Sequence, residues 1–229
     1  MKLKLLVFDV DGTIAAPSRP VTKEVAEKIR SLEERGCRIA FASGKNIAYL
    51  TGLARGIGLQ APLLIGENGC VIFDPLLMKE IRLAERPIEF AVLEAEIIQC
   101  FNDTVWIQPN QVELTIFPKT KGEMPALVSL LRELTSPLLE KIVVWEHIDA
   151  IDILPVGVDK GKALAALRTA YDLDKDMVVA VGDGKTDIPM ANECESLFLV
   201  GNQEIGSEND HLRRFPTVSD VLVYMESLL

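Results

Sequence analysis

The stretch that decides the fold runs Leu5-Leu6-Val7-Phe8-Asp9-Val10-Asp11-Gly12-Thr13. An apolar run that ends in two acids and a glycine predicts a buried β-strand whose last residues enter a site, because side chains two apart on a strand face the same way. Two carboxylates held that close together need a cation or a proton between them. The stretch suggests nucleophilic attack by one carboxylate, with acid or base assistance from the other, around a divalent metal ion.

A second apolar run repeats this arrangement later in the chain. Val178–Gly182 leads into a glycine-rich loop that carries Asp183 and Asp187. Because Asp-Gly is also ordinary turn chemistry, either stretch alone indicates little. Together they predict a carboxylate cluster, since ligands of open α/β sheets bind beyond the carboxyl ends of the strands, where both loops would open if the strands are neighbours.

The composition is that of an ordinary globular protein and limits the class of partner. The chain has 229 residues, 48% hydrophobic and 25% charged, enough for one large domain or a domain with a sizeable insert. Its net charge of -10 argues against nucleic acid or an anionic membrane as the main partner. Asp9 and Asp11 cut the first apolar stretch short of a signal-peptide core, and no segment approaches the roughly 20 apolar residues of a membrane span. We therefore expect a cytoplasmic protein. Its oligomeric state is not decided by the sequence, and a homodimer is one possibility.

Apolar periodicity divides the chain into two kinds of pattern. Strand-like and helix-like segments first alternate, at residues 5–8, 22–35, 38–42, 47–56 and 63–65. This order predicts a parallel sheet with crossover helices. From about residue 82 to 153, two helix-like stretches among alternating strands predict an α+β unit with a mainly antiparallel sheet.

The first pattern then resumes and completes the predicted architecture. It comprises helices from about 161 to 171 and from about 187, strands before Asp183 and at 197–200, and a last helix through 218–228. We expect an α/β protein with a Rossmann-like parallel sheet core and helices on both faces, formed by residues 1–81 and 154–229. A smaller α+β cap domain, residues 82–153, is inserted into it.

Four separated motifs, taken in order, resemble those of the haloacid dehalogenase-like phosphohydrolases. They are Asp9-Val10-Asp11-Gly12-Thr13, Ser43-Gly44, Lys160 and Gly182-Asp183-Gly184-Lys185-Thr186-Asp187, so the resemblance covers the whole chain. An insert between the second and third motifs is similar to the subgroup with an α+β cap that includes the Cof-type sugar phosphatases. Within that subgroup, the short chain and two further sequences most resemble archaeal phosphoglycolate phosphatases: Gly66-Glu67-Asn68-Gly69 and Asp159-Lys160-Gly161. Thr186 and Lys45 depart from the asparagine and arginine usual in the family.

The resemblance implies a catalytic role for each motif. Asp9 would be the nucleophile that becomes an aspartyl phosphate, and Asp11 the acid that protonates the leaving oxygen and then activates water. Mg²⁺ would be held by Asp9, the main-chain carbonyl of Asp11, Asp183 and Asp187, since magnesium favours oxygen ligands. The transferring phosphoryl group would be gripped by Ser43, Gly44 and Lys160.

Simpler structural roles compete for three of these residues. Ser43 could cap the helix that follows it, which does not exclude phosphate binding because both use the same geometry. Lys162 is a rival to Lys160, one of the two being a solvated lysine at the start of a helix. Asp187 could be only an N-cap for the next helix.

The substrate implied by the resemblance is a small phosphorylated metabolite, preferably 2-phosphoglycolate. The alternative is a phosphatase of carbohydrate metabolism that acts on sugar phosphates such as sucrose phosphate or mannosyl-3-phosphoglycerate. A phosphomutase would use the same phosphoaspartate but pass its phosphoryl group to a sugar. A signalling switch that keeps its phosphoaspartate is less compatible with the acid at Asp11, and a non-catalytic scaffold is less compatible with the complete set of motifs.

Overall fold

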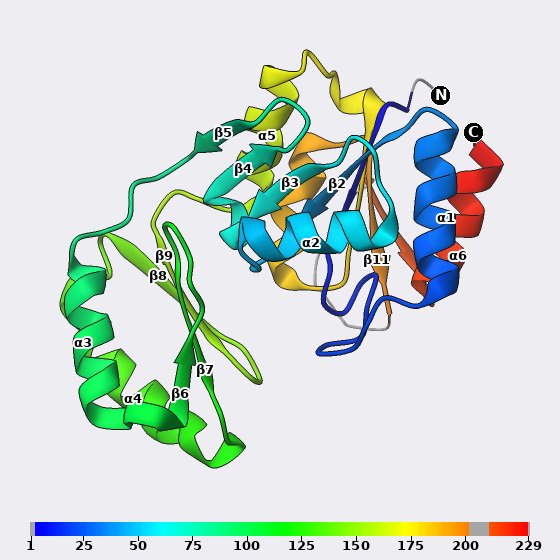
Figure 1. Cartoon of the computed structure of the whole chain (residues 1–229). Coiled ribbons are helices and arrows are strands. Elements are labelled where there is room, and N and C mark those ends of the chain that lie inside the picture. Colours follow the sequence, from blue (N-terminus) through cyan, green and yellow to red (C-terminus); the bar gives the residue numbers. More distant parts are fainter. Residues whose placement is uncertain (1–2, 202–210, 229) are drawn as a thin grey trace. The chain divides into compact units, whose positions relative to one another are not determined.

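The computed structural model describes residues 3–201 and 211–228, and the chain divides into two compact units. The first unit comprises Met1–Ile81 and Asp159–Leu229, and the second comprises Arg82–Val158 (Figure 1). The boundary expected after residue 153 falls inside strand β9 (Ile151–Pro155). It cannot lie there because β9 stays paired with its neighbour as far as Pro155, opposite Ile142.

The first unit is built on an eight-stranded sheet whose central strands are buried on both faces. The strand order is β12-β11-β10-β1-β2-β3-β4-β5, and the strands from β12 to β3 pair in parallel. These parallel strands are β1 (Leu5–Phe8), β2 (Arg38–Ala42), β3 (Leu63–Gly66), β10 (Val178–Gly182), β11 (Ser196–Val200) and β12 (Leu212–Phe215). β4 (Val71–Asp74) runs antiparallel to β3, and β5 (Lys79–Arg82) forms the edge.

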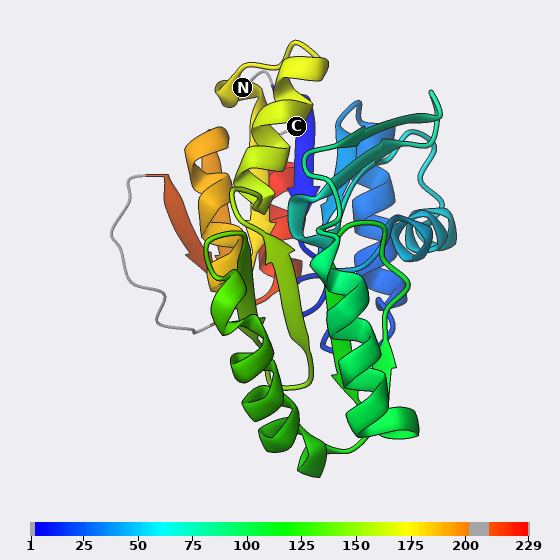
Figure 2. The ribbon, with the colours of Figure 1, turned by 90° about the vertical axis from the view of Figure 1, so that its left-hand side faces the viewer.

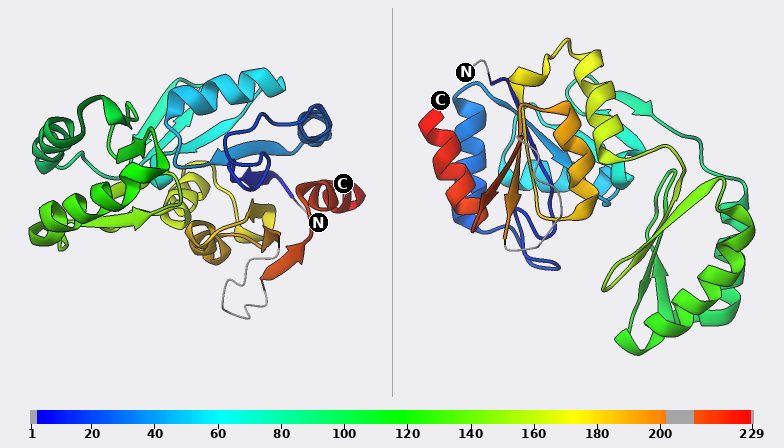
Figure 3. Two further views of the ribbon diagram at one scale, coloured as in Figure 1. Left: turned by 90° about the horizontal axis from the view of Figure 1, so that it is seen from below. Right: turned by 180° about the vertical axis from the view of Figure 1, so that it is seen from behind.

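Helices cover both faces of this sheet, as Figure 3 shows. One face carries α1 (Lys23–Glu34), α2 (Ile47–Ile57) and α6 (Val218–Leu228); the other carries α5 (Lys160–Ala170) and the 3₁₀ helix η6 (Lys185–Glu193). In α1 the buried residues Val25, Ile29 and Leu32 recur at helical spacing, which gives the helix one apolar face. The Thr22 side chain begins this helix by accepting a hydrogen bond from the amide of Val25.

The second unit packs two helices on one face of a four-stranded antiparallel sheet (Figure 2). The sheet order is β6-β7-β9-β8, with β6 (Val105–Ile107), β7 (Leu114–Pro118) and β8 (Ile142–Glu146). The helices α3 (Glu89–Phe101) and α4 (Met124–Thr135) enclose a core of their own, centred on Phe90, Ile97, Leu127 and Ile153. The predicted α/β fold class with an α+β insert is confirmed.

Several elements differ from the expectation. None of the strands β4, β5 and β12 was predicted. Each has only four residues, too few for a clear period-2 pattern, and β5 and β12 are also polar. The helix expected from Asp187 is a 3₁₀ helix that starts at Lys185 and contains Pro189, whose ring is incompatible with a regular α-helical interior. In the part of the chain that the structure describes, no helix has both the length and the apolar character needed to cross a bilayer.

Candidate active site

The site lies at the carboxyl ends of three adjacent strands. β1 is paired on one side with β2 and on the other with β10, so the residues that follow these strands emerge side by side. Asp9 follows β1 and still continues the sheet, because its amide donates to the carbonyl of Val181 at 2.9 Å. Ser43 follows β2, and Asp183 follows β10.

The chain turns sharply after Asp9, and the turn brings its backbone against Asp183. The carbonyl of Val10 accepts hydrogen bonds from the amides of Thr13, Ile14 and Ala15, which closes a single tight turn. Gly12 has φ +92°, and a Cβ on it would lie 2.3 Å from Oδ2 of Asp183. Only glycine satisfies both requirements, so the sequence Asp11-Gly12 places main chain directly beside a carboxylate.

Lys160 ties two of the carboxylates together. Its Nζ donates to Oδ1 of Asp9 and to Oδ1 of Asp187, each at 2.7 Å, and its side chain is 3% exposed. The rival residue Lys162 is exposed, and its amide is capped by the Asp159 side chain, which begins α5. The geometry therefore separates the two lysines: Lys160 belongs to the acidic cluster and Lys162 does not.

Asp9, Asp183 and Asp187 form the acidic cluster. Each offers a carboxylate oxygen, and these atoms all lie within 4.8 Å of one another. The Asp187 side chain is fixed by the backbone of the loop, because its Oδ2 accepts hydrogen bonds from the amides of Asp183 and Gly184 at 3.0 Å each. Three carboxyl groups face a single ammonium here, and oxygen-only ligands are the set that Mg²⁺ prefers. The donor set therefore fits a divalent cation.

The pKa values in the cluster follow from its burial. Burial raises the pKa of Asp9 to about 7; the Lys160 ammonium opposes this rise and the Asp187 carboxylate adds to it. Burial also raises the pKa of Asp183, again assisted by Asp187. For Lys160, burial acts to lower the pKa, but Asp187 and Asp9 outweigh it, so the pKa lies above its ordinary value and the side chain stays a cation.

Thr13 joins the cluster from the turn, a contact that sequence reasoning missed. Its hydroxyl oxygen lies 2.9 Å from Oδ2 of Asp9 and 3.3 Å from Oδ1 of Asp183, and it is buried. The signal was present, because Thr13 follows Asp9 by one turn in the first motif, but its residue type alone does not separate a hydrogen-bonding partner from a turn residue.

Ser43-Gly44-Lys45 forms a second tight turn at the end of β2. The Ser43 hydroxyl accepts a hydrogen bond from the amide of Lys45 at 3.2 Å. The helix cap suggested for Ser43 belongs instead to Asn46, whose side chain accepts from the amide of Tyr49. The Nζ of Lys45 lies 3.3 Å from Oδ2 of Asp11, so the Asp11 carboxylate is paired with a lysine and is not one of the three carboxylates of the acidic cluster.

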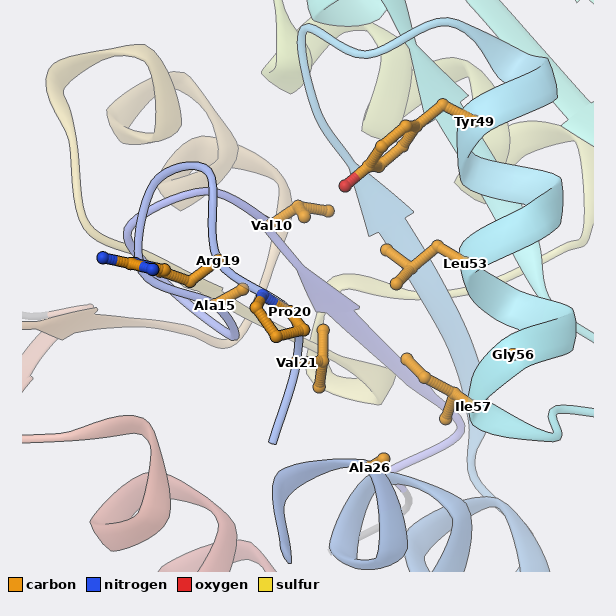
Figure 4. A pocket seen from close by; sticks show the side chains of 10 residues that line it. All are labelled: Val10, Ala15, Arg19, Pro20, Val21, Ala26, Tyr49, Leu53, Gly56 and Ile57. Atoms are coloured by element: carbon orange, nitrogen blue, oxygen red, sulfur yellow. The ribbon is translucent and has the colours of Figure 1, made fainter. Parts of the chain in front are cut away.

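A cavity of about 250 Å³ lies beside the turn that follows β1, with Val10 and Ala15 in its wall, but it is chemically different from the acidic cluster. It is lined by the chain after β1 and by α1 and α2, mainly through apolar residues such as Val10, Val21, Leu53 and Ile57. Figure 4 shows the Arg19 guanidinium directed away from the cavity. Neither Lys160 nor any of the three acids of the cluster lines this cavity.

Comparisons with known proteins agree with this geometry. The chain is 24% identical over 225 residues to a phosphoglycolate phosphatase of Methanopyrus kandleri, with 90% of this chain and 91% of that one covered. It is also 24% identical over 230 residues to an HMP-PP phosphatase of Citrobacter koseri, with 87% and 84% covered. A haloacid dehalogenase-like hydrolase from Bacteroides thetaiotaomicron has the same fold, with a TM-score of 0.81, 19% identity and 99% and 100% of the two chains covered.

The family itself is decided by a match that covers most of the sequence. The haloacid dehalogenase-like hydrolase family matches residues 6–105 and 107–206, which include all four motifs. The predicted resemblance is confirmed, and the chain belongs to the haloacid dehalogenase-like hydrolases.

Proposed function

We propose that this hydrolase is a magnesium-dependent phosphatase that acts through an aspartyl phosphate on Asp9. One observation carries the proposal: Lys160 places a permanent positive charge between Asp9 and Asp187, at 2.7 Å from each. A phosphoryl group that arrives at Asp9 would meet this ammonium together with a bound cation. Phosphoryl transfer needs mainly positioning and neutralisation of charge, and both are supplied by these groups.

The cation would be held by the carboxylates of Asp9, Asp183 and Asp187 and by the main-chain carbonyl of Asp11. The close approach of Gly12 to Asp183 supports a main-chain ligand at this point, because it leaves no side chain between the turn and the cluster. Bound there, Mg²⁺ supplies positive charge to the phosphoryl oxygens. A lysine that already contacts two of the three acids keeps them ordered when no cation is present.

The proposed reaction has two steps, transfer of the phosphoryl group to Asp9 and its transfer from Asp9 to water. In the first, a carboxylate oxygen of Asp9 forms a bond to phosphorus while the bond to the leaving oxygen breaks, and Asp11 gives that oxygen a proton. In the second, Asp11 takes a proton from water as the water oxygen attacks phosphorus. Inorganic phosphate leaves and the Asp9 carboxylate is restored. Ser43, Gly44 and Lys160 hold the phosphoryl oxygens in both steps.

The proposed substrate is a small phosphorylated metabolite, with 2-phosphoglycolate first. The relative named as a phosphoglycolate phosphatase supports this choice, and its length is matched almost completely by this chain. The relative named as an HMP-PP phosphatase is equally identical, so identity alone does not rank the two substrates. A panel that contains phosphoglycolate, HMP-PP, sucrose phosphate, mannosyl-3-phosphoglycerate and hexose phosphates tests the choice through kcat/KM. Equal kcat/KM values across the panel would show an enzyme of broad specificity and contradict a dedicated phosphoglycolate phosphatase.

The reaction itself is tested with p-nitrophenyl phosphate. Hydrolysis should require Mg²⁺, stop with excess EDTA, and fall by about 10³-fold or more in Asp9→Asn, which keeps the shape of the side chain and removes the nucleophile. Acid-quenched wild-type protein should carry phosphate on Asp9 during turnover. A stable phosphoprotein that does not turn over would favour the signalling switch, and wild-type activity in Asp9→Asn would contradict the mechanism.

A further inference from the structure

The turn Glu67-Asn68-Gly69, which follows β3, has an unusual backbone. Its three residues have φ values of 54°, 53° and 105° in succession, in the left-handed region that favours glycine. Among the described residues, four other non-glycine residues have positive φ, and all of them are exposed: Ser18, Met78, Asn102 and Asp172. Glu67 and Asn68 are instead buried, at 0% and 4% exposure. Such strain persists only where the surrounding structure holds it, and it gathers at functional sites.

Two hydrogen bonds fasten this turn to the segment after β2. The amide of Glu67 donates to the carbonyl of Lys45, and the amide of Asn68 donates to the carbonyl of Ser43, each at 3.0 Å. The side chain of Asn68 also packs on Gly44, because a Cβ on Gly44 would lie 2.9 Å from Nδ2 of Asn68. The turn therefore sets the position of the Ser43–Lys45 segment through both its backbone and a side chain.

The other end of the turn packs against the start of α5. A Cβ on Gly69 would lie 2.4 Å from the carbonyl oxygen of Asp159 and 3.1 Å from the amide nitrogen of Lys160. The three residues thus fill the space between Ser43-Gly44 and the backbone that carries Lys160. These are the two segments proposed to hold the phosphoryl oxygens, and they come from different parts of the sequence.

We infer that Glu67-Asn68-Gly69 is a rigid spacer that sets the distance between the two halves of the phosphate grip, with Asn68 as its positioning residue. This inference rests on the proposed function. The left-handed backbone turns the chain back within three residues, so one short segment can touch both Ser43 and Asp159. The buried amide of Asn68 then fixes Gly44, whose amide is proposed to face the phosphoryl oxygens.

The test compares two substitutions that relieve the same backbone strain. Asn68→Gly keeps the left-handed conformation and removes only the side chain at Gly44. Asp172→Gly does the same at an exposed position with φ 51°, outside the site. We expect both variants to fold. Asp172→Gly should keep the wild-type melting temperature, whereas Asn68→Gly should have a lower one because it removes a buried side chain. Only Asn68→Gly should lose activity: kcat/KM for p-nitrophenyl phosphate should fall by about tenfold to a hundredfold, and the inhibition constant of inorganic phosphate should rise by about tenfold.

Two outcomes would overturn the inference. The first is an Asn68→Gly variant within about twofold of wild type in both kcat/KM and phosphate inhibition. The second is an equal loss in Asp172→Gly, which would show a general response to the substitutions. If Asn68→Gly does not fold, Asn68→Asp replaces it: a carboxylate of the same size beside Gly44 should weaken phosphate inhibition by about tenfold, and an unchanged constant overturns the inference.

Failure of the proposed function would be visible separately. If the wild-type chain binds phosphate but hydrolyses no phosphoester, the proposed phosphatase function is wrong. The spacer can then still be tested through the rise in melting temperature that phosphate and Mg²⁺ produce. In that assay the rise should shrink in Asn68→Gly and persist in Asp172→Gly. A wild-type chain that shows neither turnover nor phosphate binding would overturn both proposals.

Discussion

The ammonium of Lys160 lies 2.7 Å from a carboxylate oxygen of Asp9, although 151 positions separate the two residues in the sequence. Both side chains are almost completely buried, and Lys160 makes a second contact of the same length with Asp187. A buried charge is tolerated only when it is paired and hydrogen-bonded. The pair therefore couples the stability of this unit to the same groups that are proposed to transfer a phosphoryl group.

Replacement of Lys160 should reduce both stability and activity. Lys160→Met leaves the buried carboxylates without their cation, and breaking such a pair costs about 3–5 kcal/mol in the free energy of unfolding. We expect kcat/KM for p-nitrophenyl phosphate to fall by about 10²-fold or more. Lys162→Met, two residues later on the exposed face of α5, is the matched control and should behave as wild type. Similar losses in both variants would contradict the separation of the two lysines.

Magnesium should stabilise the folded chain through the acidic cluster. At a concentration of roughly 100 times its dissociation constant, a ligand that binds only the folded state raises the free energy of unfolding by about 2.7 kcal/mol. We expect Mg²⁺ to raise the melting temperature of wild type, and Asp183→Asn to shift the midpoint of that titration by about tenfold or more. Asp176→Asn removes an equal but exposed charge and should leave the midpoint unchanged. An Asp183→Asn titration that overlays wild type would exclude this residue as a ligand.

The loss of activity in Asp11→Asn should depend on the leaving group of the substrate. p-Nitrophenolate leaves easily without a proton, whereas an alkoxide needs one, so a missing general acid costs more with an alkyl phosphate. The parameter kcat/KM reports the steps up to and including the first phosphoryl transfer. We expect Asp11→Asn to lose about tenfold or more in kcat/KM for phosphoglycolate beyond what it loses for p-nitrophenyl phosphate. Equal losses on both substrates would show that Asp11 is not the acid of the first step.

Asp74 anchors the opposite end of the sheet and should make stability depend on pH. Its carboxylate accepts hydrogen bonds from Arg38 at 2.7 Å and from the Tyr171 hydroxyl. Burial alone would raise the pKa of Asp74, but these hydrogen bonds from Tyr171 and Arg38 outweigh it, so the pKa lies below its ordinary value. The carboxylate therefore contributes stability above the unfolded pKa, and this contribution is lost as the pH falls through the lower pKa of the folded state.

The corresponding variant is Asp74→Asn, measured by denaturant unfolding between neutral and acidic pH. We expect it to be less stable than wild type by about 1.5–3 kcal/mol at neutral pH, the range for hydrogen bonds to a charged group. The difference between the two proteins should shrink in acid, because wild type then loses the same charge. A difference that stays constant down to the acid end would show that the Asp74 charge does not contribute.

Much of the fold was predictable because it depends on patterns that are local in sequence. The run Leu5–Phe8 is apolar at every position, which indicates a strand buried on both faces, and Val25, Ile29 and Leu32 mark one face of α1. Short edge elements escape this reasoning. β12 contains Arg213 and Arg214, charges that suit an edge strand but erase its apolar signal, and Pro189 turned an expected α-helix into a 3₁₀ helix.

The four motifs named the residues of the candidate site, and the tertiary structure decided which atoms of those residues meet. Sequence alone determined the strand ends that carry Asp9 and Asp183, because apolar runs and turn residues are properties of neighbouring positions. It could not assign the contacts of Thr13 with two carboxylates, the pairing of Lys45 with Asp11, or the packing of Asn68 on Gly44. Those contacts depend on the order of strands in the sheet, which brings distant segments together and which no local periodicity encodes.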